Sequence, residues 1–330
     1  MVKLSIRLDP GRTGEPSTYV DRKHMLQGVP FLGAGLGFRR EIGKEILSAS
    51  QQVNFLELIA DQYIDRPGIR EQEAADLATR FPVVLHGVDF SVGTDCPLDE
   101  TYLRSFCRIA DLTKAHWVSD HLCLTRIPGN SLGQLTPLSF TDETVRIAAK
   151  HISEIADAVG RPFLIENISY YFTMPAAVMT EAEFITAVVR EANCWLLLDL
   201  ANVMNNAANQ GYDARLFLDQ LPLDRVVQIH LAGSSYSGPL LIDSHSHPVP
   251  DQVFELLKYV APRMPSLRGV LLERDQNFPP IEELVAELEV TRQILKTHWA
   301  PYYYAGAEFP PAPDKEFTPR AKNAAASDYV

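Results

Sequence analysis

The chain has 330 residues, of which 46% are hydrophobic and 22% are charged, as expected of a globular protein with one large domain or two ordinary ones. Its formal net charge of −12 and its pI near 5.2 argue against a nucleic-acid partner or an anionic membrane surface. The four cysteines show no CxxC spacing, and no apolar run resembles a signal peptide or is long enough to cross a bilayer. We therefore expect a soluble protein of the reducing cytoplasm.

Short apolar runs that end in polar residues recur along the chain. Continuous hydrophobic runs of this kind are typical of parallel strands that are buried on both faces. The runs occupy residues 31–38, 53–60, 82–88, 116–124, 162–169, 194–203, 226–233 and 268–275.

Amphipathic segments with helix-start signals lie between these runs. Acidic residues open an expected helix over 142–159, where the helix dipole favours them. Thr180 and Glu183 form a capping-box pattern, and prolines open a last long helix over 279–295.

Strands that alternate with helices over most of the chain predict an α/β fold, a single-domain (β/α)₈ or TIM barrel. An open, doubly wound sheet is the alternative, but "GAGLGF" has Phe38 where a dinucleotide-binding turn needs its third glycine. The Pro- and Gly-rich segment 125–140 follows the fourth run, so we expect a long loop that covers the active-site mouth.

Three regions are expected along the chain. Residues 1–30 form an N-terminal extension, 31–299 form the catalytic barrel, and 300–330 form an irregular or flexible tail. We expect the aromatic cluster Tyr302–Tyr304 to pack back onto the barrel.

Polar side chains end most of the predicted strands. In a TIM barrel these strand ends meet at one rim, where catalytic residues lie. Buried carboxylates are costly without a counter-charge, no lysine ends any of these strands, and Arg274 is the only nearby cation. Bound metal ions would supply the missing charge. The residues concerned are His86, Asp120, His121, Glu166, Asn167, Asp199, Asn202, His230, Asp243, His245 and Glu273.

The segment "LLIDSHSHPVPD" (240–251) adds ligands from a loop. Asp243, His245 and His247 alternate with other residues, as in a strand that directs side chains to one side, although the segment alone also fits a solvated polar turn. We expect Asp243 and His245 to bind metal and His247 to face substrate or solvent. The combined ligand set is too large for one ion, and its imidazoles and carboxylates suit two or three ions of iron, zinc or manganese.

Seven motifs in order resemble one family. They are "LHGV", "SDHL", "IENIS", "LLLDLANV", "IHLAG", "IDSHSHPV" and "LLERD". Over residues 31–290 the chain is similar to the DUF692 proteins, the multinuclear non-heme iron-dependent oxidative enzymes (MNIO) that include the methanobactin maturase. The ligand layout also resembles endonuclease IV and, more remotely, the xylose isomerases.

The resemblance implies an oxidoreductase that holds two or three iron ions in mixed Fe(II)/Fe(III) states and uses O₂ as co-substrate. Such enzymes modify a Cys, Asp or Asn residue of a ribosomally synthesised precursor peptide, and a partner protein commonly binds the peptide's leader. The implied catalytic set contains Asp120, which orients a neighbour, Asn167, which binds metal or orients ligands, and His247. Asn202 stands where some relatives have histidine. The implied metal ligands are His86, His121, Glu166, Asp199, Asn202, His230, Asp243, His245 and Glu273.

Three other functions fit a metal-binding barrel. A zinc phosphodiesterase of the endonuclease type would need a basic groove, which a net charge of −12 disfavours. A sugar isomerase would need a lysine near the metals, and a non-catalytic metal or peptide carrier would need no reactive centre.

Overall fold

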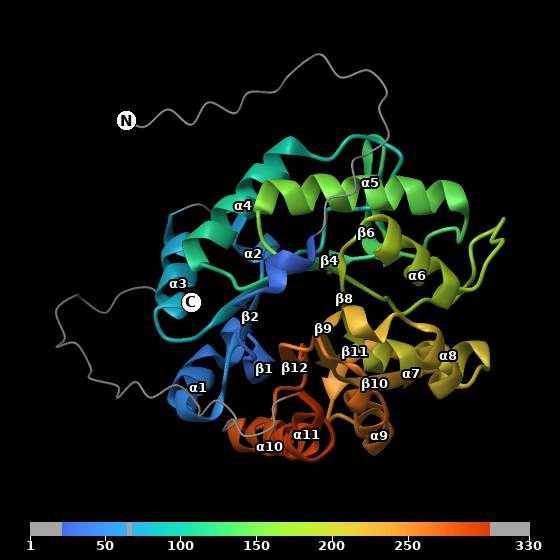
Figure 1. The fold of residues 1–330 in the computed structure, drawn as a ribbon. Coiled ribbons are helices and arrows are strands. Elements are labelled where there is room, and N and C mark those ends of the chain that lie inside the picture. Colours follow the sequence, from blue (N-terminus) through green and yellow to red (C-terminus); the bar gives the residue numbers. More distant parts are fainter. Residues whose placement is uncertain (1–21, 65–67, 304–330) are drawn as a thin grey trace, which may run out of the picture.

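The computed structural model describes residues 22–64 and 68–303 as a closed barrel of eight parallel strands surrounded by helices (Figure 1). Each of the eight predicted runs contains one barrel strand, so the TIM-barrel prediction is confirmed and the open doubly wound sheet is wrong. The strands follow one another around the barrel in the order β1 (Gly33–Gly37), β12 (Gly269–Leu272), β9 (Val226–Leu231), β8 (Trp195–Asp199), β7 (Phe163–Glu166), β4 (Val118–His121), β3 (Val83–His86) and β2 (Leu56–Ile59).

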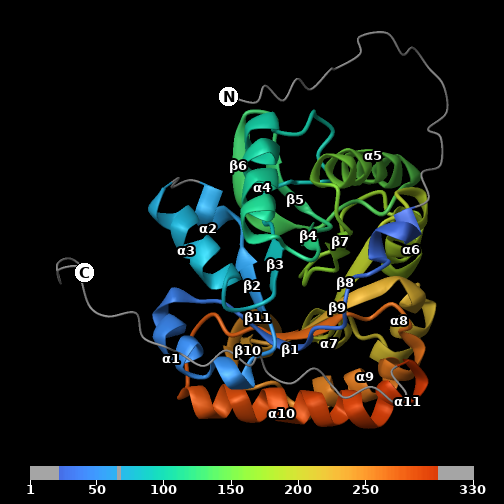
Figure 2. The ribbon, with the colours of Figure 1, turned by 60° about the vertical axis from the view of Figure 1, so that its left-hand side comes forward.

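Helices cover the outside of the barrel, as Figure 2 shows. The expected helices over 142–159 and at the last long segment are present, and the side chains of Thr180 and Glu183 cap α6 as predicted. None of the helices in the described ranges is both long and apolar enough to span a membrane. The α-helices are α1 (Gly43–Ser48), α2 (Asp61–Ile64), α3 (Ile69–Ala78), α4 (Glu100–Thr113), α5 (Asp142–Val159), α6 (Glu181–Glu191), α7 (Leu200–Gln210), α8 (Ala214–Gln220), α9 (Asp251–Val260), α10 (Ile281–His298) and α11 (Ala300–Tyr303). The short 3₁₀ helices are η1 (Arg22–Leu26), η2 (Arg40–Ile42), η3 (Ser50–Gln52), η4 (Leu223–Arg225) and η5 (Ala261–Arg263).

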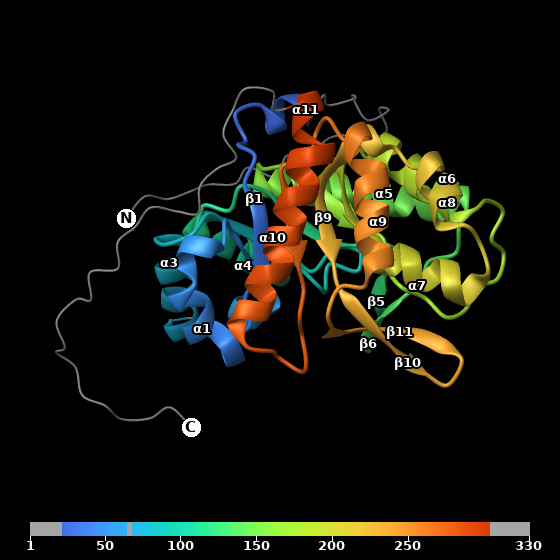
Figure 3. The same ribbon diagram turned by 90° about the horizontal axis from the view of Figure 1, so that it is seen from below.

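Two antiparallel hairpins extend from the end of the barrel at which the strands terminate, opposite α11 (Figure 3). One is β5 (Leu124–Ile127) with β6 (Asn130–Thr136), so the expected long loop over 125–140 is wrong. A two-residue turn, Pro128 and Gly129, joins its strands, and Gly129 supplies the positive φ of +80° that its position in the turn requires. The other hairpin pairs β10 (Gly233–Ser237) with β11 (Leu240–His247).

The barrel has a small interior core, separate from the larger core between strands and helices. Phe55, Trp117 and Trp195 fill much of it, and Leu26 of η1 packs against it. Gly35 makes room for this core, because a Cβ atom there would lie 2.6 Å from the Phe55 ring.

The start of the predicted tail is helical. Residues 300–303 form α11, in which the Tyr303 hydroxyl donates a hydrogen bond of 2.7 Å to the carbonyl oxygen of Pro262. Tyr303 therefore packs back as expected, whereas Tyr304 and residues 1–21 lie outside the described residues. The boundaries between extension, barrel and tail stay predictions.

Candidate metal centre

Strand alternation places the polar residues above the interior core. Side chains two positions apart point to the same side of a strand, so the residue two positions after each inward apolar side chain also points inward. Each of these apolar side chains belongs to the interior core, and the polar residue two positions on is buried. The pairs are Phe55 with Glu57, Val84 with His86, Leu164 with Glu166, Leu197 with Asp199, and Leu271 with Glu273.

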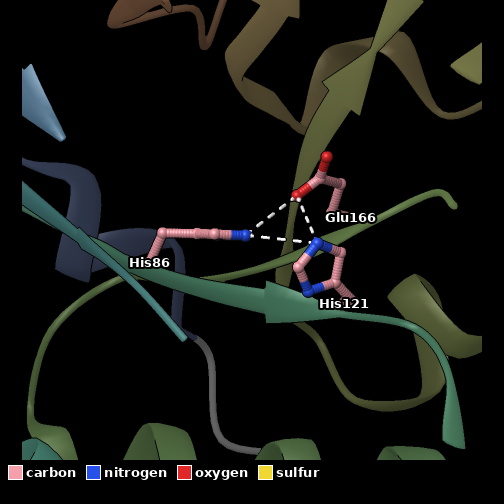
Figure 4. Close-up of side chains that lie close together, drawn as sticks. All are labelled: His86, His121 and Glu166. Atoms are coloured by element: carbon pink, nitrogen blue, oxygen red, sulfur yellow. Dashed lines mark hydrogen bonds and ion pairs between the residues drawn. The ribbon is translucent and has the colours of Figure 1, made fainter. Parts of the chain in front are cut away.

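The first group of candidate ligands joins three neighbouring strands (Figure 4). His86 Nε2 lies 3.3 Å from Glu166 Oε2, and His121 Nε2 lies 3.5 Å from the same oxygen. The other ring nitrogen of His86, Nδ1, lies 2.8 Å from Ser119 Oγ, which orients the ring so that Nε2 faces the group. Two imidazoles and one carboxylate thus converge on one point.

The second group shares Glu166 with the first and adds Asp199, His230 and Glu273. His230 Nδ1 lies 3.4 Å from Glu166 Oε1 and 3.0 Å from Glu273 Oε2. Asp199 uses Oδ1 to accept a 2.6 Å hydrogen bond from the backbone N–H of Asn202, at the start of α7. Its second oxygen, Oδ2, is buried and has no hydrogen-bond partner among residues 22–64 and 68–303.

A third set of side chains lies beside Glu273. His245 Nε2 lies 2.8 Å from Asp243 Oδ1, and His245 Nδ1 lies 3.0 Å from Asp275 Oδ2 and 3.6 Å from Glu273 Oε2. His245 has a φ of +48°, an unfavourable backbone conformation for a residue with a side chain, as is frequent at functional sites. Segment 240–251 thus begins with a strand, and it brings Asp243 and His245 together.

Crowded buried charges shift several pKa values. Burial lowers the pKa of His86 well below its usual value, and His121 and His230 lower it further. Burial raises the pKa of Asp199 well above its usual value, with Glu166 and Asp243 adding to the shift. Burial lowers the pKa of His230, but Glu273, Glu57 and Glu166 raise it more, so the net shift is strongly upward. The upward shifts of Asp199 and His230 reflect an excess of buried negative charge, which a bound cation would relieve, whereas the downward shift of His86 favours the neutral imidazole that a metal ion needs.

The donor set fits metal ions. Its nitrogen and carboxylate oxygen atoms face one another at 3.0–3.5 Å in the first two groups, and several of them are buried without a hydrogen-bond partner in the part of the chain that the structure describes. Imidazole with carboxylate, without thiolate, is the ligand chemistry of iron, zinc and manganese. The partnerless ligand atoms are Glu166 Oε2, Asp199 Oδ2, His230 Nδ1, Asp243 Oδ1 and His245 Nε2.

Two predicted site residues hold neighbouring strands together. Asn167 donates to the carbonyl oxygen of Asp199 at 3.0 Å and accepts from the Asp199 backbone N–H at 2.9 Å. This geometry suits a residue that orients Asp199. Asp120 accepts from the backbone N–H groups of His121 and Phe90 at 2.6 and 3.2 Å, which suits the orienting role expected of it.

Two other predicted residues lie differently. The Asn202 side chain accepts from Ser169 Oγ at 2.7 Å and donates to the carbonyl oxygen of Asn167 at 3.0 Å, so both of its polar atoms have protein partners. His247 is exposed, and its Nδ1 lies 2.8 Å from Ser246 Oγ. The roles of Asn202 and His247 stay predictions.

Sequence reasoning missed Glu57, which lies fully buried beneath the second group. Its Oε2 accepts a 2.6 Å hydrogen bond from Gln228 Nε2 and lies 3.1 Å from His230 Nε2. Glu57 stands inside an apolar run rather than at its end. Glu57 lies two residues after Phe55, so strand alternation places both side chains on the inner side of the barrel. This spacing was the feature of the sequence that could have identified it.

The cation beside the ligand carboxylates is Arg39. The expectation that Arg274 would be this cation is wrong. Arg39 Nη2 lies 3.4 Å from Glu273 Oε1 and 2.5 Å from Asp275 Oδ1. Arg274 is equally buried but turns away, because the residue before it, Glu273 at the end of β12, points inward, and it pairs with Glu287 at 3.5 Å.

Comparison with known proteins identifies the family. The family described as "RiPP precursor modification enzyme MbnB/TglH/ChrH" matches residues 33–296. The chain belongs to this family. It is a metal-dependent enzyme family, it corresponds to the DUF692 resemblance, and it makes a precursor peptide the expected substrate class.

Curated relatives agree with this assignment. The UPF0276 protein of Caulobacter vibrioides (strain NA1000 / CB15N) is 38% identical over 264 residues, which cover 80% of this chain and 94% of the relative. The UPF0276 protein PM0211 of Pasteurella multocida (strain Pm70) is 34% identical over 293 residues, covering 81% and 95%.

Solved structures share the barrel. Endonuclease IV from Thermus thermophilus matches with a TM-score of 0.53 and 20% identity, covering 80% of this chain and 99% of that protein. D-Psicose 3-epimerase from Clostridium cellulolyticum H10 matches with a TM-score of 0.51 and 10% identity, covering 81% and 99%. At these identities the similarity establishes the fold alone.

Proposed function

We propose that this protein is a multinuclear non-heme iron oxidase that uses O₂ to modify a Cys, Asp or Asn residue of a ribosomally synthesised precursor peptide. The family supports the substrate class, and the ligand groups support a centre with more than one metal ion. In this proposal the enzyme works in the cytoplasm, in agreement with a sequence whose four cysteines show no CxxC spacing and no dense framework.

The observation that carries the proposal is the position of Glu166 between the two groups. Its Oε2 faces His86 and His121, whereas its Oε1 faces His230. A carboxylate that offers its two oxygens to two ligand groups is suited to bridge adjacent metal ions. A centre with a single ion would not need the two oxygens of Glu166 to face different ligand groups.

Each proposed ligand has a defined part. His86 and His121 would hold one ion together with Glu166, while Asp199, His230 and Glu273 would hold a second. Asp243 and His245 would complete a third position or a ligand sphere beside Glu273. Asn202 remains a candidate ligand next to Asp199. Iron in such a centre supplies the redox equivalents for the reaction of substrate with O₂.

The protein's own contribution is orientation and the exclusion of water. Ser119 and Glu57 contact the ring nitrogens of His86 and His230 that face away from the groups, so they help to fix which nitrogen points inward. The ligands of the first two groups lie on barrel strands or directly after them, above a packed interior core that limits solvent access from below. The peptide would enter from the rim that carries the two hairpins, with its leader bound by a partner protein.

No specific observation favours the other functions. Net charge −12 disfavours a phosphodiesterase acting on nucleic acid. For a sugar isomerase, the described cation at the centre is Arg39 rather than a lysine.

The test is aerobic co-expression with the precursor peptide encoded by a short open reading frame beside the gene, with repeated Cys or a C-terminal Asp. We expect a mass change in the peptide that His121→Ala and Glu273→Ala abolish, while His116→Gln, at the opposite end of β4, preserves it. Mössbauer spectra of anaerobically purified protein should show at least two iron sites. An unmodified peptide in the presence of iron-loaded enzyme and leader-binding partner would refute the proposal.

A further inference from the structure

Asp275 stands between Arg39 and His245 at the edge of the metal centre. Asp275 Oδ1 accepts from Arg39 Nε at 2.6 Å, and Asp275 Oδ2 lies 3.0 Å from His245 Nδ1. The backbone N–H of Asp275 also donates to the carbonyl oxygen of His245 at 2.8 Å. Three segments far apart in sequence, after β1, in β11 and after β12, thus meet at one carboxylate.

We infer that Asp275, held in orientation by Arg39, is a positioning residue that fixes the tautomer of His245, so that Nδ1 carries the proton and Nε2 faces the metal beside Asp243. The inference rests on the proposed metal centre. A carboxylate can only accept a hydrogen bond, so the nitrogen facing Asp275 must donate. Asp243 Oδ1 faces His245 Nε2 at 2.8 Å, but these two atoms form no hydrogen bond with each other or with any other described residue, whereas Nδ1 is hydrogen-bonded to Asp275. His245 Nε2 and Asp243 are therefore both left to bind metal.

Arg39 makes the arrangement directional. Its guanidinium has only donors, so the Asp275 oxygen that faces it must accept. If residue 275 were asparagine, Arg39 would hold the amide oxygen and turn the amide nitrogen toward His245. The amide would then donate to His245 Nδ1 and place the proton on Nε2, which could no longer bind metal.

The tautomer of His245 and its dependence on Asp275 can be tested on the zinc-loaded, full-length protein. In wild-type protein labelled with ¹⁵N-histidine, and assigned with His245→Gln, we expect long-range ¹H–¹⁵N spectra to show a protonated Nδ1 and an unprotonated Nε2 on His245. Asp275→Asn should weaken the last zinc ion bound by 10–100-fold, the usual effect of losing a residue that orients a ligand. A protonated Nε2 in wild type, or unchanged zinc affinity in Asp275→Asn, would overturn the inference.

A double variant separates orientation from general structural damage. In Arg39→Met/Asp275→Asn the amide can rotate and present its oxygen to His245, so zinc affinity should recover to within about threefold of Arg39→Met alone. A merely structural role predicts that the double variant binds zinc no better than Asp275→Asn, which would overturn the inference. Arg274→Met is the matched control, because Arg274 is as buried as Arg39 but pairs with Glu287, and it should leave zinc binding unchanged.

The readouts are independent of oxidation chemistry. Correct tautomer and zinc affinities in a protein that modifies no peptide would refute the proposed function and leave this inference standing. An active oxidase in which His245 carries its proton on Nε2 would refute this inference and leave the proposed function standing.

Discussion

Replacing Asp199 by asparagine should have opposite effects on the metal-free and the metal-loaded protein. Without metal, the buried Asp199 carboxylate is unfavourable because burial, Glu166 and Asp243 all raise its pKa well above the usual 3.8. Asn removes this charge but keeps the oxygen that caps α7, where Asp199 accepts from the Asn202 backbone N–H at 2.6 Å. Asp199→Asn should therefore stabilise the metal-free protein.

The size of this gain has a ceiling. At pH 7 a carboxylate can always escape the cost of burial by taking up a proton, at about 1.4 kcal/mol for each pH unit above its ordinary pKa. Starting from 3.8, the gain from Asp199→Asn is therefore limited to roughly 4 kcal/mol, and we expect about 1 kcal/mol or more. With metal present, a 100-fold loss of affinity removes about 2.7 kcal/mol of linked stability, so a gain of about 1 kcal/mol becomes a net loss of roughly 1.7 kcal/mol, and a gain near the ceiling falls by more than half.

The assay is urea unfolding at pH 7, with chelator and with saturating Fe(II) under anaerobic conditions. Asp213→Asn is the matched control, because Asp213 caps α8 in the same way through the backbone N–H groups of Arg215 and Leu216, but it is exposed. It should change both forms equally and by only a few tenths of a kcal/mol. An Asp199→Asn variant that is destabilised equally in both forms would refute the reasoning, since it would mean that Asp199 acts through packing alone.

Two further predictions concern stability away from the metal ligands. Burial raises the pKa of Glu181 to about 8, so the folded state binds a proton more tightly than the unfolded state and stability should fall as pH rises from about 4.5 to about 8. Glu181→Gln keeps an acceptor for the Tyr170 hydroxyl. It should reduce the difference in unfolding free energy between pH 5 and pH 8, measured by urea titration, by up to about 4 kcal/mol. An unchanged difference would contradict the raised pKa of Glu181. Gly35→Ala should destabilise by about 1–3 kcal/mol, because the new Cβ would lie 2.6 Å from both the ring and the backbone carbonyl oxygen of Phe55, of which only the ring can be trimmed by substitution. Adding Phe55→Leu should recover part of that loss, and a double variant weaker than the sum of both changes would argue against this contact as the cause.

The sequence allowed the barrel and most ligands to be predicted for a simple reason. Apolar runs mark buried parallel strands, and barrel closure brings their ends to one rim whatever lies between them. His86, Glu166, His230 and Glu273 could be placed together from their positions in the runs alone. Their distances of 3.0–3.4 Å in the structure agree with that placement.

The residues that escaped prediction depend on side-chain direction rather than on position in a run. Arg39 and Arg40 are adjacent, yet one reaches Glu273 and the other pairs with Glu73. Arg274 follows Glu273 directly but faces outward to Glu287. Near a strand end a change of one position reverses the side-chain direction, and the loop that follows decides where a long side chain reaches. Closeness in sequence to Glu273 therefore predicted Arg274 as the cation of the site, whereas the structure places Arg39 there.

The candidate ligands also differ in how firmly the fold holds them. His86, Glu166 and His230 lie on barrel strands with neighbours hydrogen-bonded on both sides. Asp243 and His245 lie instead on the β10–β11 hairpin, whose pairing shifts register and whose His245 has a positive φ. Metal positions built on the strands are prearranged, whereas a position that needs His245 depends on how the hairpin is seated against Asp275. We therefore expect the number of ions that the enzyme holds to be set by the hairpin, with the ions between the strands binding first and the ion at His245 binding last.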